Sequence, residues 1–150
     1  MASGAFTSAG TTIGVVSGDP STYDASGFES LTYALVGEVT DLGEFGREYS
    51  LVTHNPLGDR QTVKRKGSFN DGSISMTVAR VPDDAGQTVL QEALDSDDNY
   101  SFNVTLQDGT ELYFSAQVMS YTANVGTVDQ ITTASVTIEI TDEIIEVSPA

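Results

Sequence analysis

The chain has 150 residues, of which 39% are apolar, and its 22 acidic and six basic residues give a formal charge of -16. The absence of cysteine excludes disulfides and thiolate metal sites, and a single histidine, His54, is too few for an ordinary zinc site. The acidic charge argues against a protein that binds nucleic acid through its phosphates, because such proteins carry strongly basic surfaces. We expect one domain over residues 1–150 and no cofactor.

Residues 1 to about 30 are rich in Gly, Ser, Thr and Ala, which predicts a flexible N-terminal arm with at most one short strand. The start MASGAFTSAG lacks the features of a signal peptide, and no apolar run approaches the roughly 20 residues that cross a bilayer. We therefore expect a soluble protein made in the cytosol. Residues 141–150 form a C-terminal tail that either frays or packs through Ile144, Ile145 and Val147.

From Leu31 onward, short segments of alternating polarity predict antiparallel strands with one buried face. Two less regular segments, ALVGEVTDLG and EYSLVTH, come first, and a long inter-strand loop of about 53–69 follows. Asn70-Asp71-Gly72 and Asp108-Gly109 are turn signals that precede later strands. The regular strands are SISMTVAR, YSFNVTLQ, ELYFSAQVMS and ITTASVTIEI, with inward positions at Ile74, Met76, Val78, Tyr100, Phe102, Val104, Leu106, Leu112, Phe114, Ala116, Val118, Ala134, Val136, Ile138 and Ile140.

One segment, PDDAGQTVLQEALDS, breaks the period of two and predicts a helix over about 83–95. Asp84 can cap this helix, and Gln87 stands where its side chain would complete a capping box. An apolar stripe at helical spacing follows, formed by Val89, Leu90, Ala93 and Leu94. The predicted fold is therefore mainly β, an antiparallel sandwich or barrel with one flanking helix.

The acidic turn after this helix holds Asp95, Asp97 and Asp98, where the negative end of the helix dipole disfavours them. The spacing of Asp95, Asp97 and Asn99 resembles the start of a calcium loop, but tyrosine and leucine occupy the glycine and final glutamate positions. We interpret the turn as solvated or paired with another subunit, and we expect no metal site.

Catalytic groups are not evident in the sequence. Carboxylates are numerous enough for two to meet in space, but no nucleophile, base and oxyanion donors form a recognisable set. His54 precedes the turn sequence Asn55-Pro56-Leu57-Gly58, which indicates a loop residue rather than a general base. We expect no enzymatic activity.

The basic triplet Lys64, Arg65 and Lys66 supplies half of all basic residues in the chain. One interpretation is a solvated loop tip, since three charges are fewer than most nucleic-acid footprints use. The other is an assembly contact, because the strongest partner for a basic loop in an acidic homo-oligomer is the acidic surface of the next copy.

The order of the motifs between Leu31 and Ile140 resembles the major tail tube proteins of long-tailed, non-contractile bacteriophages. The points of similarity are the VGEVTDLGEFG start, the KRKGSFNDG loop before a strand, the DDAGQ helix start, the YSFNVTLQDG hairpin and the VGTVDQIT approach to a last strand. The family implies a structural protein of the virion. Six copies form a ring with a continuous inner barrel, and stacked rings form the tube through which DNA reaches the host.

The resemblance also implies roles for particular residues. The loop of about 53–69 corresponds to a connection that orders against neighbouring subunits in relatives. We predict that Lys64, Arg65 and Lys66, with Arg60, contact acidic residues of an adjacent subunit, first of all the Asp95, Asp97 and Asp98 turn. Candidate lumen-lining groups, which would repel DNA phosphates, are Glu38, Asp41, Glu44 and Glu48.

Other partners implied by the family are tail-tip, tape-measure and tail-terminator proteins, with assembly in the bacterial cytoplasm and no membrane. The alternatives are a ring-forming tube protein of a contractile tail or secretion-type machine and a carbohydrate-binding β-sandwich. The second needs an exposed aromatic platform, yet tryptophan is absent.

Overall fold

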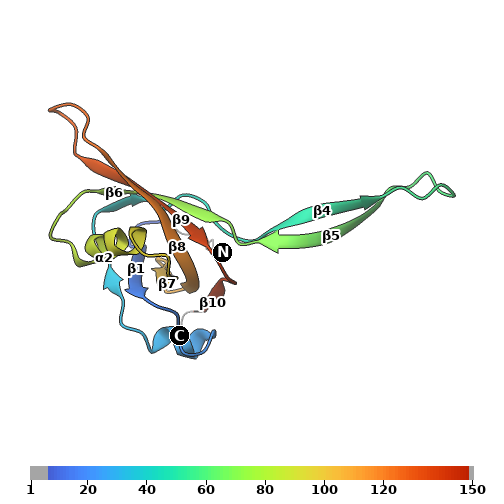
Figure 1. Ribbon diagram of the computed structural model, residues 1–150, viewed down its shortest axis with the longest axis horizontal. Coiled ribbons are helices and arrows are strands. Elements are labelled where there is room, and N and C mark those ends of the chain that lie inside the picture. Colours follow the sequence, from blue (N-terminus) through green and yellow to red (C-terminus); the bar gives the residue numbers. More distant parts are fainter. Residues whose placement is uncertain (1–6, 149–150) are drawn as a thin grey trace, which may run out of the picture.

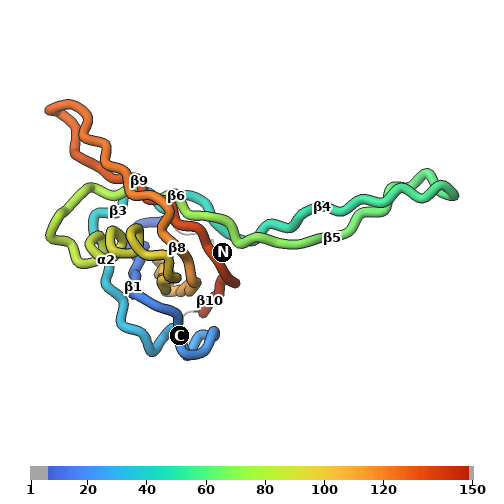
Figure 2. The backbone as a smooth tube through the Cα atoms, in the orientation of Figure 1, coloured from blue at the N-terminus to red at the C-terminus, as the bar shows by residue number. Residues whose placement is uncertain are grey.

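The computed structural model describes residues 7–148 as a curled antiparallel sheet from which a long hairpin projects (Figures 1 and 2). No helix within that range is long and apolar enough to span a membrane. In chain order the elements are β1 (Thr12–Ser17), α1 (Ala25–Glu29), β2 (Ala34–Leu35), β3 (Val39–Asp41), β4 (Glu48–His54), β5 (Val63–Asn70), β6 (Ser73–Ala79), α2 (Ala85–Leu94), β7 (Tyr100–Thr105), β8 (Glu111–Asn124), β9 (Thr133–Ile140) and β10 (Ile145–Val147).

The main sheet has the strand order β2-β1-β7-β8-β9-β6-β3, and β10 also pairs with β8. Every pairing between named strands is antiparallel. The sheet curls into a half-barrel, with β2 and β3 at its two ends and α2 packed beside it (Figure 1). The predicted mainly β fold with a flanking helix is therefore confirmed.

The core lies on the inner face of this curl, where the alternation of the sequence places it. Ile74, Val78 and Ile138 are fully buried, and β6 and β9 set Ile74 directly opposite Ile138. The rings of Phe102 and Phe114 stack across β7 and β8 with centroids 5.5 Å apart. Burial of one face of the long strands in a shared core that contains these rings is the main stabilisation of the body.

Helix α2 begins as predicted at Asp84, whose side chain accepts a hydrogen bond from the Gln87 N–H at 3.0 Å. The expected capping box is wrong in its other half, in which the Gln87 side chain would accept from the backbone N–H of Asp84. The buried Gln87 side chain has other partners. Its Nε2 donates to the carbonyl oxygens of Gly37 and Ala79, and its Oε1 accepts from the Val81 N–H. Gln87 thus joins the helix to the segments around β2 and β6.

Within the predicted N-terminal arm, the short strand that the prediction allowed is β1, which lies between β2 and β7 in the sheet. Ile13 and Val15 are fully buried there, so these two positions belong to the core despite the small residues around them. Residues 1–6 of the predicted arm and residues 149–150 of the predicted tail lie outside the described range. Within the tail, residues 145–147 form β10.

A second buried cluster covers the outer face of β8 and is centred on Phe28. The Phe28 ring stacks on Tyr113 at 5.5 Å, and Tyr23 meets Phe28 edge-on at 5.0 Å. Burial raises the pKa of Tyr23 to about 12, and burial also raises the pKa values of Tyr33 and Tyr113 above their usual range. This cluster explains why β8 is buried on both faces although the sequence predicted one.

Candidate functional site: the projecting hairpin and the exposed edges

Strands β4 and β5 form a sheet of their own that extends away from the body (Figures 1 and 2). Every residue of β4 is exposed, including Leu51 at 67% and Val52 at 52%. A two-stranded hairpin without a packed face is marginally stable in water. Exposed apolar side chains in such number are unusual on the surface of a monomeric protein.

The expected loop of about 53–69 is largely wrong, because Val63–Asn70 is strand β5 and the connection is confined to residues 55–62. The basic triplet lies within β5, where Lys64, Arg65 and Lys66 stand opposite Thr53, Val52 and Leu51. Successive side chains of a strand point to opposite faces. Lys64 and Lys66 therefore share one face of the hairpin, and Arg65 lies on the other.

The four cationic groups of the predicted contact are Arg60, Lys64, Arg65 and Lys66, and all are exposed. Across residues 7–148, ion pairs within 4 Å involve Arg47 and none of these four side chains. In the part of the chain described, Lys66 is the only member of the triplet whose charge contacts an aromatic ring. Its Nζ lies 4.8 Å from the centroid of the Tyr49 ring. Within residues 7–148, these four positive charges therefore have no carboxylate partner.

Arg47 anchors the root of the hairpin, a role that the sequence analysis missed. Its Nε lies 3.5 Å from the Asp71 carboxylate, and its second terminal nitrogen lies 3.4 Å from the carboxylate of Glu143. Its Cζ sits 4.0 Å from the centre of the Phe69 ring, and its first terminal nitrogen donates to the Tyr49 hydroxyl at 3.4 Å. One side chain thereby links both hairpin strands to the C-terminal segment.

The acidic turn after α2 is exposed at Asp95, Asp97 and Asp98, and Asp95 is the C-cap residue of the helix. Gln117 holds the backbone of this turn by donating to the Asp97 carbonyl oxygen at 3.2 Å. The turn makes no ion pair with the basic triplet inside one subunit, within residues 7–148. The predicted pairing concerns two different subunits and stays a prediction.

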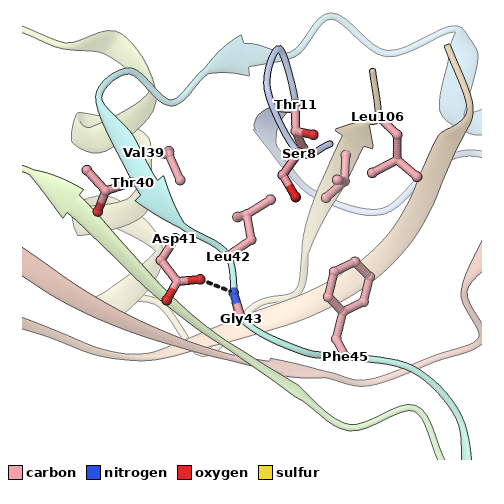
Figure 3. A pocket seen from close by; sticks show the side chains of 10 residues that line it. Ser8, Thr11, Val39, Thr40, Asp41, Leu42, Gly43, Phe45 and Leu106 are labelled. Atoms are coloured by element: carbon pink, nitrogen blue, oxygen red, sulfur yellow. Dashed lines mark hydrogen bonds between the residues drawn. The ribbon is translucent and has the colours of Figure 1, made fainter. Parts of the chain in front are cut away.

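The candidate lumen residues Glu38, Asp41, Glu44 and Glu48 are all exposed along the stretch from β2 to β4. Glu38 has a positive φ of 59°, which is uncommon for a residue other than glycine. Asp41 ends the edge strand β3, and its carboxylate accepts a hydrogen bond from the Gly43 N–H at 2.8 Å (Figure 3). Glu38 and Asp41 thus stand at the two ends of β3, whereas Glu48 lies in the hairpin strand β4, and the facing of all four carboxylates in an assembly stays a prediction.

A shallow hollow of about 310 Å³ lies beside this edge, between β3 and the end of β7 (Figure 3). Val39, Leu42 and Phe45 form much of its apolar wall, and Asp41 is its one titratable lining group among the residues described. No group of three or more potential metal-ligating side chains converges anywhere in residues 7–148. The hollow therefore offers no set of groups for acid–base or metal chemistry.

A family model described as "Lambda phage tail tube protein, TTP" matches residues 18–144. The chain belongs to this family. The resemblance deduced from the sequence is confirmed, and the chain is a structural, non-enzymatic component of a phage tail tube and thus of the virion. Membership also implies assembly of many copies into a tube.

Solved structures with the same fold come from several tail-like machines. The chain superposes on a protein in the "anti-feeding prophage (AFP) baseplate" with a TM-score of 0.68 at 9% identity, covering 99% of this chain and 98% of the other. It superposes on a protein of the "SPP1 tail tube" with a TM-score of 0.62 at 15% identity, covering 91% of this chain and 75% of the other. A protein of the "PVC sheath/tube terminator" of an extracellular contractile injection system gives a TM-score of 0.63 at 13% identity, with 92% of this chain and 93% of the other covered. No curated protein matches the sequence.

Proposed function

We propose that this chain forms stacked hexameric rings that build a hollow tail tube and that phage DNA passes through the tube into the host. The observation that carries the proposal is the β4–β5 hairpin, whose apolar and cationic side chains are left exposed by the residues that the structure describes. A surface of this kind on a member of a tube-forming family is explained by contact with further copies.

The open ends of the half-barrel support ring formation. β2 and β3 terminate the sheet, so each has one side without a strand partner among the residues described. The unpaired backbone N–H and C=O groups of an edge strand can bind a further strand, and native proteins pair or cover such edges. Pairing of one edge with the opposite edge of the next copy is a head-to-tail contact, and such contacts close into rings when the rotation permits.

The charge of the molecule supports a conduit for DNA. A surface with 22 acidic and six basic residues repels phosphates, and repulsion acts over roughly 8 Å at physiological salt. We assign Glu38, Asp41, Glu44 and Glu48 to the lumen because they are exposed carboxylates on the segment that runs through the edge strand β3 into the hairpin. Tail-tip, tape-measure and terminator proteins are the proposed partners at the tube ends.

A second exposed apolar surface lies in the connection between β8 and β9, which projects on the opposite side from the β4–β5 hairpin (Figure 1). Val128 and Ile131 are 98% and 76% exposed there, and Val125 is 65% exposed. Two uncovered projections on opposite sides of one subunit suit repeated contacts along a tube.

A second candidate function is the tube of a contractile tail or injection machine. It is favoured by the likeness to proteins in an anti-feeding prophage baseplate and in a contractile injection system. The phage tail tube is favoured over it because the family model matches the sequence itself over residues 18–144. The likeness to the contractile machines is one of fold, at 9% and 13% sequence identity.

Electron microscopy of the concentrated, purified protein tests the proposal. We expect hollow tubes or sixfold rings, and a protein that stays monomeric at every salt and protein concentration would overturn it. In a finer test, Lys64, Arg65 and Lys66 are all changed to Glu, and we expect the yield of tubes to fall at least tenfold. Arg80→Glu is the control to compare with each single reversal, because Arg80 is also exposed and lies outside the hairpin.

The same reversal also tests the predicted acidic partner. If Asp95, Asp97 and Asp98 meet the basic strand, changing them to Lys in the reversed background restores tubes. Tubes that form unchanged after the first reversal show that the basic strand is no assembly contact. Loss without rescue assigns the partner to other carboxylates.

A further inference from the structure

The outer edge of β2 lies against the first turn of helix α2, and β2 has no second strand partner among the residues described. On its inner side, the Val36 N–H just after β2 donates to the Ile13 carbonyl oxygen of β1 at 2.9 Å. Backbone groups of successive strand residues point to alternate edges, so those of Leu35 and Gly37 point away from β1. These are the groups that a further strand would bind.

Helix α2 supplies partners to both backbone groups of Gly37. The Gly37 N–H donates to the carboxylate of Asp84 at 3.1 Å, and the Gly37 carbonyl oxygen accepts from Nε2 of Gln87 at 3.1 Å. In an antiparallel ladder, the residue directly opposite makes the same two bonds with its own C=O and N–H groups. Asp84 and Gln87 together therefore take the place of one residue of a neighbouring strand.

Gly86 closes off the carbonyl oxygen of Leu35. A Cβ atom at Gly86 would lie 2.4 Å from this oxygen and 2.5 Å from the Cα atom of Val36, so the position requires glycine. A further strand would lie about 4.8 Å from β2. It would therefore overlap the first turn of α2.

The same side chains are fixed by additional bonds to the body of the subunit. The Asp84 oxygen that binds Gly37 also accepts from the Gln87 N–H at 3.0 Å, so it caps the helix as well. Gln87 is 2% exposed, donates to the Ala79 carbonyl oxygen and accepts from the Val81 N–H. The contact of α2 with β2 is therefore a built part of the fold.

We propose that Asp84, Gly86 and Gln87 form an edge cap, which prevents the β2 edge of one copy from pairing with the β2 edge of a second copy. An open edge binds further strands, and a covering helix is one way in which native proteins prevent this. The partner that suits an uncapped β2 edge is the same edge of another copy, because two identical edges can pair antiparallel about a twofold axis.

Such a twofold pair would compete with the growth of a tube. It uses the same surface on both copies, so it leaves no site for a head-to-tail neighbour at that end of the sheet. With the edge cap in place, a neighbour in a ring meets this end through α2 and the other end through β3. This consequence rests on the proposed function, whereas the edge cap itself concerns the single subunit.

Two substitutions together remove the edge cap and keep the helix. Asp84→Ser retains an N-cap side chain for the Gln87 N–H, but serine is too short to reach the Gly37 N–H as well. Gln87→Met keeps the length of the side chain and removes its bond to the Gly37 oxygen. The matched control is Asp83→Ser with Gln91→Met, which changes the same residue types at exposed positions of this region.

Hydrogen exchange and sedimentation velocity give the two readouts, at protein concentrations below those at which tubes form. We expect the Gly37 amide to exchange about tenfold faster or more in the cap variant than in the control. We also expect the cap variant to form dimers at a protein concentration about tenfold lower or less. A photoreactive amino acid at Leu35, which is 59% exposed, is expected to join the two copies within residues 34–37.

A core variant separates edge pairing from a general loss of stability. Val104→Ala truncates a fully buried side chain of β7, which is separated from β2 by β1, and it leaves the edge cap intact. We expect this variant to stay monomeric at the same concentrations.

Three results would overturn the edge cap: unchanged exchange at Gly37, a cap variant that stays monomeric, or a core variant that gives the same dimers cross-linked at Leu35. Microscopy of the wild-type protein at high concentration is a separate test. Absence of tubes there would overturn the proposed function and leave the result on the edge cap unchanged.

Discussion

The curled sheet and the β4–β5 hairpin follow the same antiparallel rules but are stabilised in different ways. In the sheet, one face of each long strand is buried in a shared core that contains Phe102 and Phe114, and helix α2 adds Leu90 and Ala93 to it. In the hairpin, all seven residues of β4 are exposed. The body thus buries its apolar atoms within the subunit, whereas the described part of the chain leaves those of the hairpin exposed to solvent.

The largest expected effect breaks the core of the body. Phe102→Ala removes a fully buried ring that stacks on Phe114, and we expect it to lower the free energy of unfolding by about 3 to 5 kcal/mol. Chemical denaturation of the unassembled subunit measures the change.

Phe69→Ala in the hairpin is the control for this comparison, because Phe69 is the same residue type at 50% exposure. We expect this variant to lower the free energy of unfolding by less than about 1 kcal/mol in the same experiment. We also expect it to reduce the yield of tubes clearly. Equal destabilisation by both variants would contradict the separation of a self-stabilised body from a dependent hairpin.

A smaller effect concerns the polar connection between α2 and the sheet. Gln87→Ala leaves the carbonyl oxygens of Gly37 and Ala79 and the Val81 N–H without their side-chain partner. We expect a loss of about 2 to 4 kcal/mol, because unpaired polar groups near the core keep their desolvation penalty. Chemical denaturation measures this loss. Gln91→Ala is the control, because Gln91 is an exposed glutamine of the same helix, and a loss of similar size in this variant would refute the explanation.

The smallest effect is expected at the junction of the two regions. Arg47→Ala removes the contacts to Asp71, Glu143 and Phe69, so the hairpin root loses its link to the C-terminal segment. We expect amide hydrogen exchange in β4 and β5 to become severalfold faster, with little change in the body. Arg80→Ala serves as the control, and unchanged exchange in the Arg47 variant would show that the root is held by other contacts.

The regular strands were predictable because their physical cause is local. Ile74, Met76 and Val78 alternate with polar residues, and the structure buries all three. Helix α2 was predictable for the same reason, through the cap at Asp84 and the stripe that contains Leu90 and Ala93. In these segments a single pattern specified both the element and its buried face.

Elements without a clear pattern were predicted incorrectly or incompletely. β1 lies among Gly, Ser and Thr, and its place in the sheet depends on pairing with β7, far along the chain. β5 has no apolar alternation, so its strand character comes from the backbone ladder with β4. No short-range signal identifies a strand of this kind.

For the candidate site, the sequence by itself determined that three adjacent positive charges stand in a strongly acidic chain, and its motifs indicated the family. Only the tertiary structure decided how those charges are arranged. The β5 ladder places Lys64 and Lys66 on one face and Arg65 on the other, and a bulge at Gly67 brings Phe69 to the side of Lys66. The physical reason is that charge is a property of composition, whereas the direction of a side chain depends on strand register, which forms only when distant segments pair.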